Sequence, residues 1–217
     1  EVVVELTVPN YRPAANRSSD GLKVLRPSTL DFDIEKSKGQ IKLDGNSYKY
    51  ITNLKIKVPR KTNLILDTYR DGFIHVQDVE GTFNLRSQNN DIRMNRVSGS
   101  ARLWSYNGNL AADFKSLASD RPLYLESYNG SIDLMLPVGT KANAKYRSGS
   151  GTVTTDFDFT PSEDIMKIEG DGTVEFDEFV RGTLNGGGTQ LTVSTEKGDI
   201  RLRKRMSRID GQSKATH

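Results

Sequence analysis

Residues 101–112 read ARLWSYNGNLAA, and residues 123–134 read LYLESYNGSIDL. In both stretches apolar residues occupy the first, third, tenth and twelfth positions, and a serine occupies the fifth. Alternating apolar residues predict short strands with one buried face. The Tyr-Asn-Gly between them favours a turn. Each stretch therefore predicts two strands joined by a tight corner.

The same spacing occurs six times along the chain. The six stretches begin at Leu64, Phe83, Ala101, Leu123, Ala144 and Leu191. A period of about twenty residues is typical of coils that stack on one another. We therefore predict an all-β, single-domain parallel β-helix (β-solenoid) of about seven to eight short, right-handed coils. The alternative is an antiparallel sandwich or barrel, which also alternates apolar and polar residues but does not require one repeated unit.

Two further segments extend the predicted repeat. An early coil is predicted from the matching offsets of Phe32, Ile34, Ile41 and Leu43. A degenerate coil is predicted in the long gap before Leu191, from Ile165, Ile168, Val174 and Phe176. The predicted organisation is an N-terminal strand and capping segment (1–31), a β-solenoid domain (32–204) and a basic C-terminal tail (205–217).

The corners between paired strands carry Gly and Asn, which accept positive φ at little cost. We expect sharp bends at Gly108, Gly130, Gly151 and Gly198. The Gly186-Gly187-Gly188 run predicts another tight corner before the strand at Leu191. The Ser or Thr two residues after each first pair of apolar residues lies on the same, inward side of its strand. Its side chain should therefore point into the corner.

Charge is concentrated at the C-terminal end. The chain has a net charge of +3, and residues 201–217 alone carry six basic residues against one acid, a net +5. Such a segment can contact an anionic polymer or lipid headgroups. It can also be a solvated end that keeps the sheet from pairing with other chains. The second interpretation is favoured, and no nucleic-acid partner is predicted, because no aromatic residues are interleaved with the charges.

Cysteine content, apolar runs and the first residues of the chain bear on its location, although the absence of cysteine does not by itself choose a compartment. The chain of 217 residues has no cysteine, which excludes a disulfide framework and thiol chemistry. No apolar run approaches the length of a membrane span, so the chain is not expected to cross a membrane. It begins at Glu1 in a strand-like segment, as expected after removal of a signal peptide. The predicted location is extracytoplasmic, in the periplasm or at the cell surface.

The sequence offers little for catalysis. A hydrolase acting on glycans needs two facing carboxyl groups. Asp113 and Asp133 are the two acids that the repeat could bring near one another. His75 lacks the partners of a zinc site, and Asp156 and Asp158 lack the spacing of a calcium loop. We expect no enzyme activity, no cofactor and no metal site. A carbohydrate-active enzyme of the β-helix type, a polysaccharide lyase or hydrolase, is the alternative.

Exposed aromatic residues are the candidate binding site. The repeat places three tyrosines in one column at the corner and directs Trp104 outward between Arg86 and Glu126 of adjacent coils. Aromatic rings beside hydrogen-bonding groups are used in sugar and protein contacts. The alternative is a stacked ladder that only stabilises the corner. The predicted ligand-binding residues are Trp104, Tyr69, Tyr106, Tyr128, Arg86 and Glu126.

An ordered series of motifs across residues 30–204 resembles the bacterial "putative adhesin" domain family of unknown function. The motifs are the two Ser-Tyr-Asn-Gly units at 105–110 and 127–132, LKIKVP at 54–59, LP at 136–137, TDFD at 155–158, LNGGG at 184–188 and GDIRL at 198–202. The chain departs from the pattern at Gln88-Asn89-Asn90-Asp91 and at Glu196-Lys197, where the corner shape could differ. The resemblance implies an exported β-solenoid with no established enzyme activity and no agreed catalytic residues.

Together these observations favour a non-catalytic, extracytoplasmic binding or scaffold protein, adhesin-like, that presents strand faces to a partner. The expected partner is a cell-envelope glycan or another protein. Self-association through the open ends of the solenoid is a further possibility, because unpaired edge strands can pair with other chains.

Overall fold

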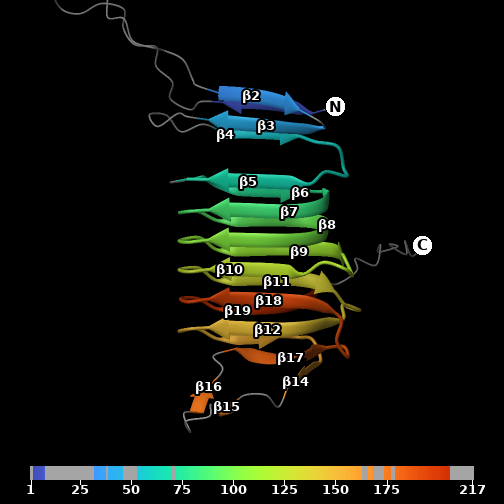
Figure 1. The fold of residues 1–217 in the computed structure, drawn as a ribbon, viewed down its shortest axis with the longest axis vertical. Coiled ribbons are helices and arrows are strands. Elements are labelled where there is room, and N and C mark those ends of the chain that lie inside the picture. The colour runs from blue at the N-terminus through green and yellow to red at the C-terminus, as the bar shows by residue number, and fades with distance from the viewer. Residues whose placement is uncertain are drawn as a thin grey trace, which may run out of the picture. The chain divides into compact units, whose positions relative to one another are not determined.

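The computed structural model describes residues 2–7, 32–37, 39–45, 53–69, 72–162, 166–168, 174–176 and 179–205. The chain falls into two compact units, Glu1–Pro59 and Arg60–His217. All regular structure in the described residues is β-strand (Figure 1). The all-β class predicted from the sequence is confirmed.

The first unit contains two antiparallel pairs. β1 (Val3–Thr7) pairs with β4 (Asn53–Lys57), and β2 (Phe32–Ser37) pairs with β3 (Gln40–Gly45). The turn between β2 and β3 contains Gly39, whose φ of 79° lies in the left-handed region. The predicted early coil is therefore wrong, because a tight turn joins strands antiparallel while parallel neighbours need a longer connection. These strands belong to the first unit, so the unit boundary follows Pro59 and differs from the boundary predicted after residue 31.

In the second unit the first strands of the six repeats pair in parallel. In spatial order they are β5 (Leu64–Thr68), β7 (Glu80–Ser87), residues 101–105 of β8 (Ile92–Ser105), β10 (Leu123–Ser127), β18 (Thr189–Thr195) and β12 (Ala142–Ser148). We call this set the first sheet face. Leu66, Leu85, Leu103 and Leu125 lie at one register position across the face. The alignment read from the sequence is thus the alignment of the strands.

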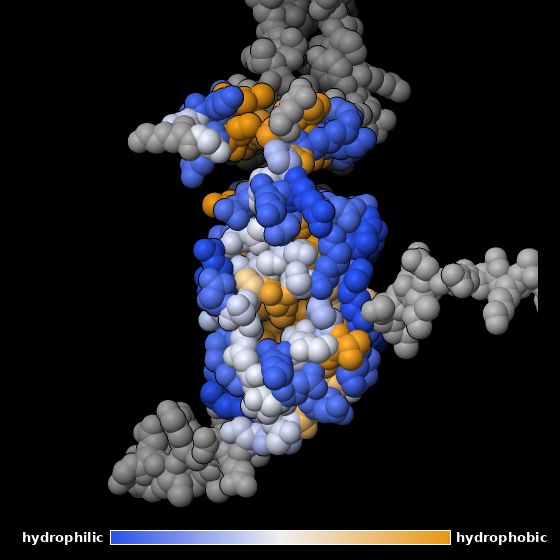
Figure 2. All heavy atoms as spheres, turned by 90° about the vertical axis from the view of Figure 1, so that its right-hand side faces the viewer, coloured by the Kyte–Doolittle hydropathy of each residue, from blue (hydrophilic) through white to orange (hydrophobic). Residues whose placement is uncertain are grey.

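The second strands of the repeats form a matching parallel set, the second sheet face. It consists of β6 (Ile74–Gln77), the start of β8, β9 (Leu110–Leu117), β11 (Ile132–Pro137), β19 (Ile200–Arg205) and β13 (Val153–Thr155). Most inward residues of both faces are buried, and Phe83, Leu85, Ile92, Met94 and Ile132 have no exposed surface. Hydrophilic residues predominate on the surface of this unit that Figure 2 shows. The alternation in the sequence therefore gives one continuous apolar core, because every second side chain of a strand points the same way.

The order of the repeats in space differs from their order in the chain. The last repeat, β18 and β19, lies between the fourth repeat (β10, β11) and the fifth (β12, β13). All repeats offer the same apolar pattern at the same register. The pattern therefore does not specify which repeat a given strand will neighbour.

The described residues between β13 and β18 also depart from the parallel pattern, so the sheet is mixed. β17 (Val180–Leu184) lies antiparallel to β12 and to β14 (Phe159–Pro161), and it occupies the outer edge of β12. β15 (Met166–Ile168) and β16 (Val174–Phe176) form an antiparallel pair. The predicted degenerate coil is therefore wrong, and its Ile165 lies outside the described residues. Arg205 ends β19, while residues 206–217 of the predicted tail also lie outside them.

The Ser and Thr residues point into the corners, as predicted. Ser127 Oγ donates to the carbonyl oxygen of Gly108 at 2.8 Å, and Thr195 Oγ1 donates to that of Gly130 at 2.7 Å. Each hydroxyl therefore satisfies a carbonyl group of the neighbouring repeat. The corner at Glu196-Lys197 uses the same backbone hydrogen bonds as the Tyr-Asn-Gly corners, so the expected difference in shape does not extend to its pairing.

The reason for glycine in the corners differs from the one predicted. Gly130 has no positive φ; instead, a Cβ there would lie 2.1 Å from the carbonyl oxygen of Gly108. Gly198, with a φ of 148°, does have the predicted backbone requirement. The tight corner at Gly186-Gly187-Gly188 is confirmed, since φ is positive at the first two of these residues and Gly187 N–H donates to Leu184 O.

Candidate functional site

The outward side chains of the first sheet face form the candidate site. Asp67, Arg86, Trp104, Glu126 and Ser194 occupy one register position on five neighbouring strands. The last four point outward because the residues on either side of each are buried, and Asp67 is exposed between the partly buried Leu66 and Thr68. A second outward row, two residues earlier, contains Asn84, Arg102, Tyr124 and Thr192.

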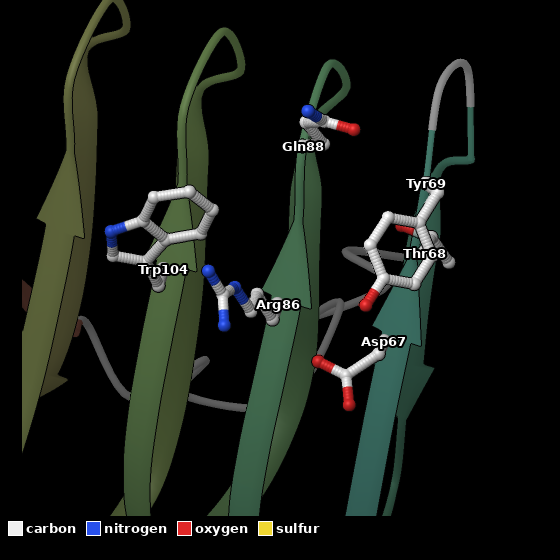
Figure 3. Close-up of a pocket in the computed structure, with 6 residues that line it drawn as sticks. All are labelled: Asp67, Thr68, Tyr69, Arg86, Gln88 and Trp104. Carbon is white, nitrogen blue, oxygen red and sulfur yellow. The ribbon is translucent and has the colours of Figure 1, made fainter.

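Two adjoining hollows follow these rows. The smaller, of about 80 Å³, is lined by Asp67, Thr68, Tyr69, Arg86, Gln88 and Trp104 (Figure 3). The larger is a groove of about 540 Å³ that shares Asp67, Arg86 and Trp104 with the first and continues past Arg102, Tyr124 and Glu126. We call the two hollows together the face groove. Its walls combine aromatic rings with charged and hydroxyl groups.

Two arginines in the face groove lie against aromatic rings. The guanidinium carbon of Arg86 lies 4.5 Å from the centroid of the Trp104 ring, and that of Arg102 lies 5.3 Å from the centroid of Tyr124. In Figure 3 the guanidinium of Arg86 extends toward Trp104, while the carboxylate of Asp67 lies on the other side of the Arg86 strand. A cation over an aromatic face is attracted by the quadrupole of the ring, which fixes both side chains.

The predicted aromatic column is only partly continuous. The rings of Tyr106 and Tyr128 stack with centroids 5.0 Å apart and an interplanar angle of 6°, and Trp104 lies 6.5 Å from Tyr106. Tyr69 is 78% exposed and lines the smaller hollow across from Arg86. The structure therefore joins Trp104, Tyr106 and Tyr128 through ring contacts. Trp104 and Tyr69 line the face groove, whereas Tyr106 and Tyr128 line neither of its hollows.

The remaining two predicted residues also reach the groove. Arg86 lines both hollows, and the exposed Glu126 lies beside Trp104 in register and lines the larger one. Arg102, Tyr124 and Asp67 were not predicted. The outward parity of Trp104 and Glu126 could have indicated Arg102 and Tyr124, which lie two residues earlier on the same strands. Their ring contact depends on which strands are neighbours.

The groups considered for catalysis are engaged elsewhere. On the second sheet face, Asp133 accepts hydrogen bonds from Arg203, and Asp113 accepts one from Arg205 at 2.6 Å. His75 is exposed and shares a 3.0 Å hydrogen bond with Asn95. Within the described residues no group of three or more His, Cys, Asp or Glu side chains is placed to hold a metal ion.

The basic strand β19 is largely neutralised by its neighbours. Arg203 and Arg205 form salt bridges with Asp133 and Asp113, and Arg201 lies 3.6 Å from Asp199. The pKa of Asp199 is lowered chiefly because Thr152 donates hydrogen bonds to its carboxylate. The part of the basic segment that the structure describes therefore pairs internally, which agrees with the structural interpretation of these charges.

A further ion pair joins Arg96 of β8 to Asp78, the residue that follows β6. Arg96 donates two hydrogen bonds to Asp78, and both residues have positive φ, of 52° and 56°. These hydrogen bonds lower the pKa of Asp78 to about 2. Lys115 lies 3.9 Å from the same carboxylate. The pair fixes the bend at which β8 passes from one sheet face to the other.

Across the described residues, no helix has the length and hydrophobicity needed to span a bilayer.

Comparison with known proteins gives one remote likeness. No family model matches the sequence, and no curated protein does. Among solved structures, a "putative cell adhesion protein" from Clostridium sporogenes is similar, with a TM-score of 0.47 and 11% identical residues. The alignment covers 94% of this chain and 99% of that one. At this identity and TM-score the likeness does not identify a ligand.

Proposed function

We propose that the six parallel repeats of the second unit form a right-handed β-solenoid and that the protein is a non-catalytic, adhesin-like bacterial protein acting outside the cytoplasm. Its face groove binds a partner in the cell envelope, either a glycan or a protein. Fractionation of the native host provides a test of location, and recovery of the protein in the cytoplasm alone would contradict that part of the proposal.

The observation that carries this proposal is the face groove itself. Trp104, Tyr124 and Tyr69 supply apolar ring surface, while Arg86, Arg102 and Glu126 supply hydrogen-bonding groups within the same hollows. Aromatic residues and arginine contribute most of the binding energy in many interfaces. A hollow with apolar walls and a few convergent polar groups is the usual form of a ligand site.

The sheet beneath the groove favours recognition because it is rigid. Apart from Tyr69 and Gln88, which follow the ends of β5 and β7, each groove residue lies on a strand. β7, β8, β10 and β18 are paired in register on both sides, and the inward side chains of their groove segments belong to the buried core. A ligand that binds a preorganised surface loses less free energy to ordering of the protein.

The positions of the groove carboxylates argue against hydrolysis. Asp67 and Glu126 lie at one register position on β5 and β10, with β7 and residues 101–105 of β8 between them. Three steps between neighbouring strands separate the two backbones by about 14 Å. A glycosidase needs its carboxyl groups about 5–10 Å apart, so this pair suits binding better than acid–base catalysis.

The proposal is tested by substituting the central aromatic residue. Wild-type protein, Trp104→Ala and Tyr106→Ala are compared on an array of cell-envelope glycans and by crosslinking to envelope proteins. We expect saturable binding by the wild-type protein, roughly tenfold or greater weakening in Trp104→Ala, and a smaller loss in Tyr106→Ala, whose ring contacts Trp104 but lines neither hollow, with both variants folded. Phe73→Ala is the matched control, since Phe73 is an exposed aromatic residue outside the face groove. Equal binding by all four proteins would refute the role of the groove.

A further inference from the structure

The two groove arginines differ from Arg203 and Arg205 of the second sheet face. Arg203 forms a salt bridge with Asp133 on the neighbouring strand β11, and Arg205 forms one with Asp113 on β9, the strand beyond β11. Within the described residues, Arg86 and Arg102 form no salt bridge. Each guanidinium lies over an aromatic ring instead. Asp67 lies directly opposite Arg86 in register, yet the two form no salt bridge.

The donors of these arginines are available to a ligand. A guanidinium has five N–H donors, and within the described residues Arg86 and Arg102 contact aromatic rings and donate no side-chain hydrogen bond. The ring also holds the long side chain in place, which lowers the entropy lost when it binds a ligand. Arg86 and Arg102 therefore present two fixed sets of donors to the groove, on adjacent strands.

The ligand chemistry that fits such donors is a carboxylate. The carboxylate group accepts two parallel hydrogen bonds from a guanidinium, and these charge-assisted bonds are about twice as strong as neutral ones. The rings of Trp104 and Tyr124 supply apolar surface next to each arginine. Sugar rings have apolar C–H faces that pack on such surface, and uronic acid residues add a carboxylate to each ring.

We infer that the face groove binds an acidic glycan, with carboxylates of its uronic acid residues held by Arg86 and Arg102. The inference rests on the proposed binding function and specifies its ligand class. The two groove carboxylates, Asp67 and Glu126, oppose an anionic ligand and lie on the strands that flank β7 and β8. They confine the bound carboxylates to the two central strands between them.

The experiment is affinity electrophoresis of the full chain in gels that contain polygalacturonate, dextran or polyacrylate. Dextran supplies sugar rings without charge, and polyacrylate supplies carboxylates without sugar rings. The variants are Arg86→Gln, Arg102→Gln, Glu126→Gln and the Trp104→Ala variant of the preceding section. Arg93→Gln is the matched control, because Arg93 also lies over an aromatic ring, Phe73, but on the second sheet face.

We expect polygalacturonate to retard the wild-type protein more than either other polymer, and salt to weaken the effect. Arg86→Gln and Arg102→Gln should each bind roughly tenfold or more weakly, the loss typical of a charge-assisted hydrogen bond. Glu126→Gln should bind more tightly, and Arg93→Gln should match the wild-type protein.

Three results would overturn the inference. Equal retardation by polyacrylate that neither groove variant reduces would assign the binding to general charge, including that of the basic C-terminal segment. Retardation by dextran that depends on Trp104 would keep the proposed binding function and replace the ligand class by a neutral glycan. Absence of retardation by polygalacturonate would exclude the acidic ligand, and the array of the preceding section would then decide whether the binding function itself fails.

Discussion

Replacing Gly130 by alanine should destabilise the second unit, because the corner of the neighbouring repeat occupies the place of the new methyl group. A Cβ at this position lies 2.1 Å from the carbonyl oxygen of Gly108. Atoms in real structures do not approach a Cβ more closely than 3.0 Å, so the two corners must separate by almost 1 Å. The opposing atom belongs to the backbone, so rotation of a side chain cannot relieve the contact.

The magnitude follows from the bonds that hold these corners together. Tyr128 N–H donates to Ser105 O at 3.0 Å, Asn129 N–H donates to Tyr106 O at 2.8 Å, and Ser127 Oγ donates to Gly108 O at 2.8 Å. Separation by almost 1 Å takes each bond beyond the usual donor–acceptor range, and each contributes about 1 kcal/mol. Alanine also lowers the conformational entropy of the unfolded chain, which offsets the loss of stability by about 0.4–1 kcal/mol. The expected net loss is about 2–3 kcal/mol.

Urea unfolding followed by circular dichroism measures this loss, with the slope of the transition unchanged. In thermal unfolding it corresponds to a midpoint lower by about 4–12 °C for a domain of this size. Gly139→Ala is the matched control, because a Cβ at Gly139 meets nothing within 4 Å and its φ is not positive. A Gly130→Ala variant within about 0.5 kcal/mol of wild type, or a Gly139→Ala variant equally destabilised, would refute the reasoning.

Ser127→Ala removes the hydroxyl that donates to Gly108 O in a buried corner, and urea unfolding should show a loss of about 1 kcal/mol; no loss would mean that water replaces the bond. Leu134→Ala empties a fully buried position and should lower stability by about 2–5 kcal/mol, so a smaller change in the same assay would contradict the packing. Asp78→Asn tests a pH dependence, since Arg96 lowers the folded-state pKa of Asp78 from 3.8 to about 2. The ion pair therefore stabilises the fold fully above the unfolded-state pKa, and this stabilisation is lost as the pH falls through about 2. The free energies of unfolding of wild type and variant should converge there. A constant difference between them across the pH range would contradict the assignment.

The repeat was predictable because its signal is local and recurs. Ser105, Ser127 and Thr195 occupy the inward position that their spacing from the preceding apolar pair predicts. Parity also placed Trp104 and Glu126 on the outer side of their strands. A strand has only two sides, so each apolar residue in a row fixes the orientation of its neighbours.

The predictions of an early coil and of a degenerate coil were wrong for the same physical reason. The offsets of Ile34 and Leu43 fit either parallel coils or an antiparallel hairpin, since both keep alternate residues on one side. The short turn at Gly39 decides for the hairpin, and pairing of Met166 with Phe176 decides likewise in the later segment. The alternation of apolar residues predicts which side of a strand is buried, but it does not predict whether the neighbouring strand is parallel or antiparallel.

The sequence by itself determined the two short strand segments of each of the six repeats, their inward and outward sides, and the residue types at the corners, because these depend on spacings within a few residues. The tertiary structure decided that the last repeat lies between the fourth and the fifth, and that Arg86 and Arg102 stack on rings of neighbouring strands. It also decided that Gly130 is required by a carbonyl group of another repeat and not by its own φ. These features depend on which repeats are neighbours, and identical apolar patterns leave that choice to the packing of the whole unit.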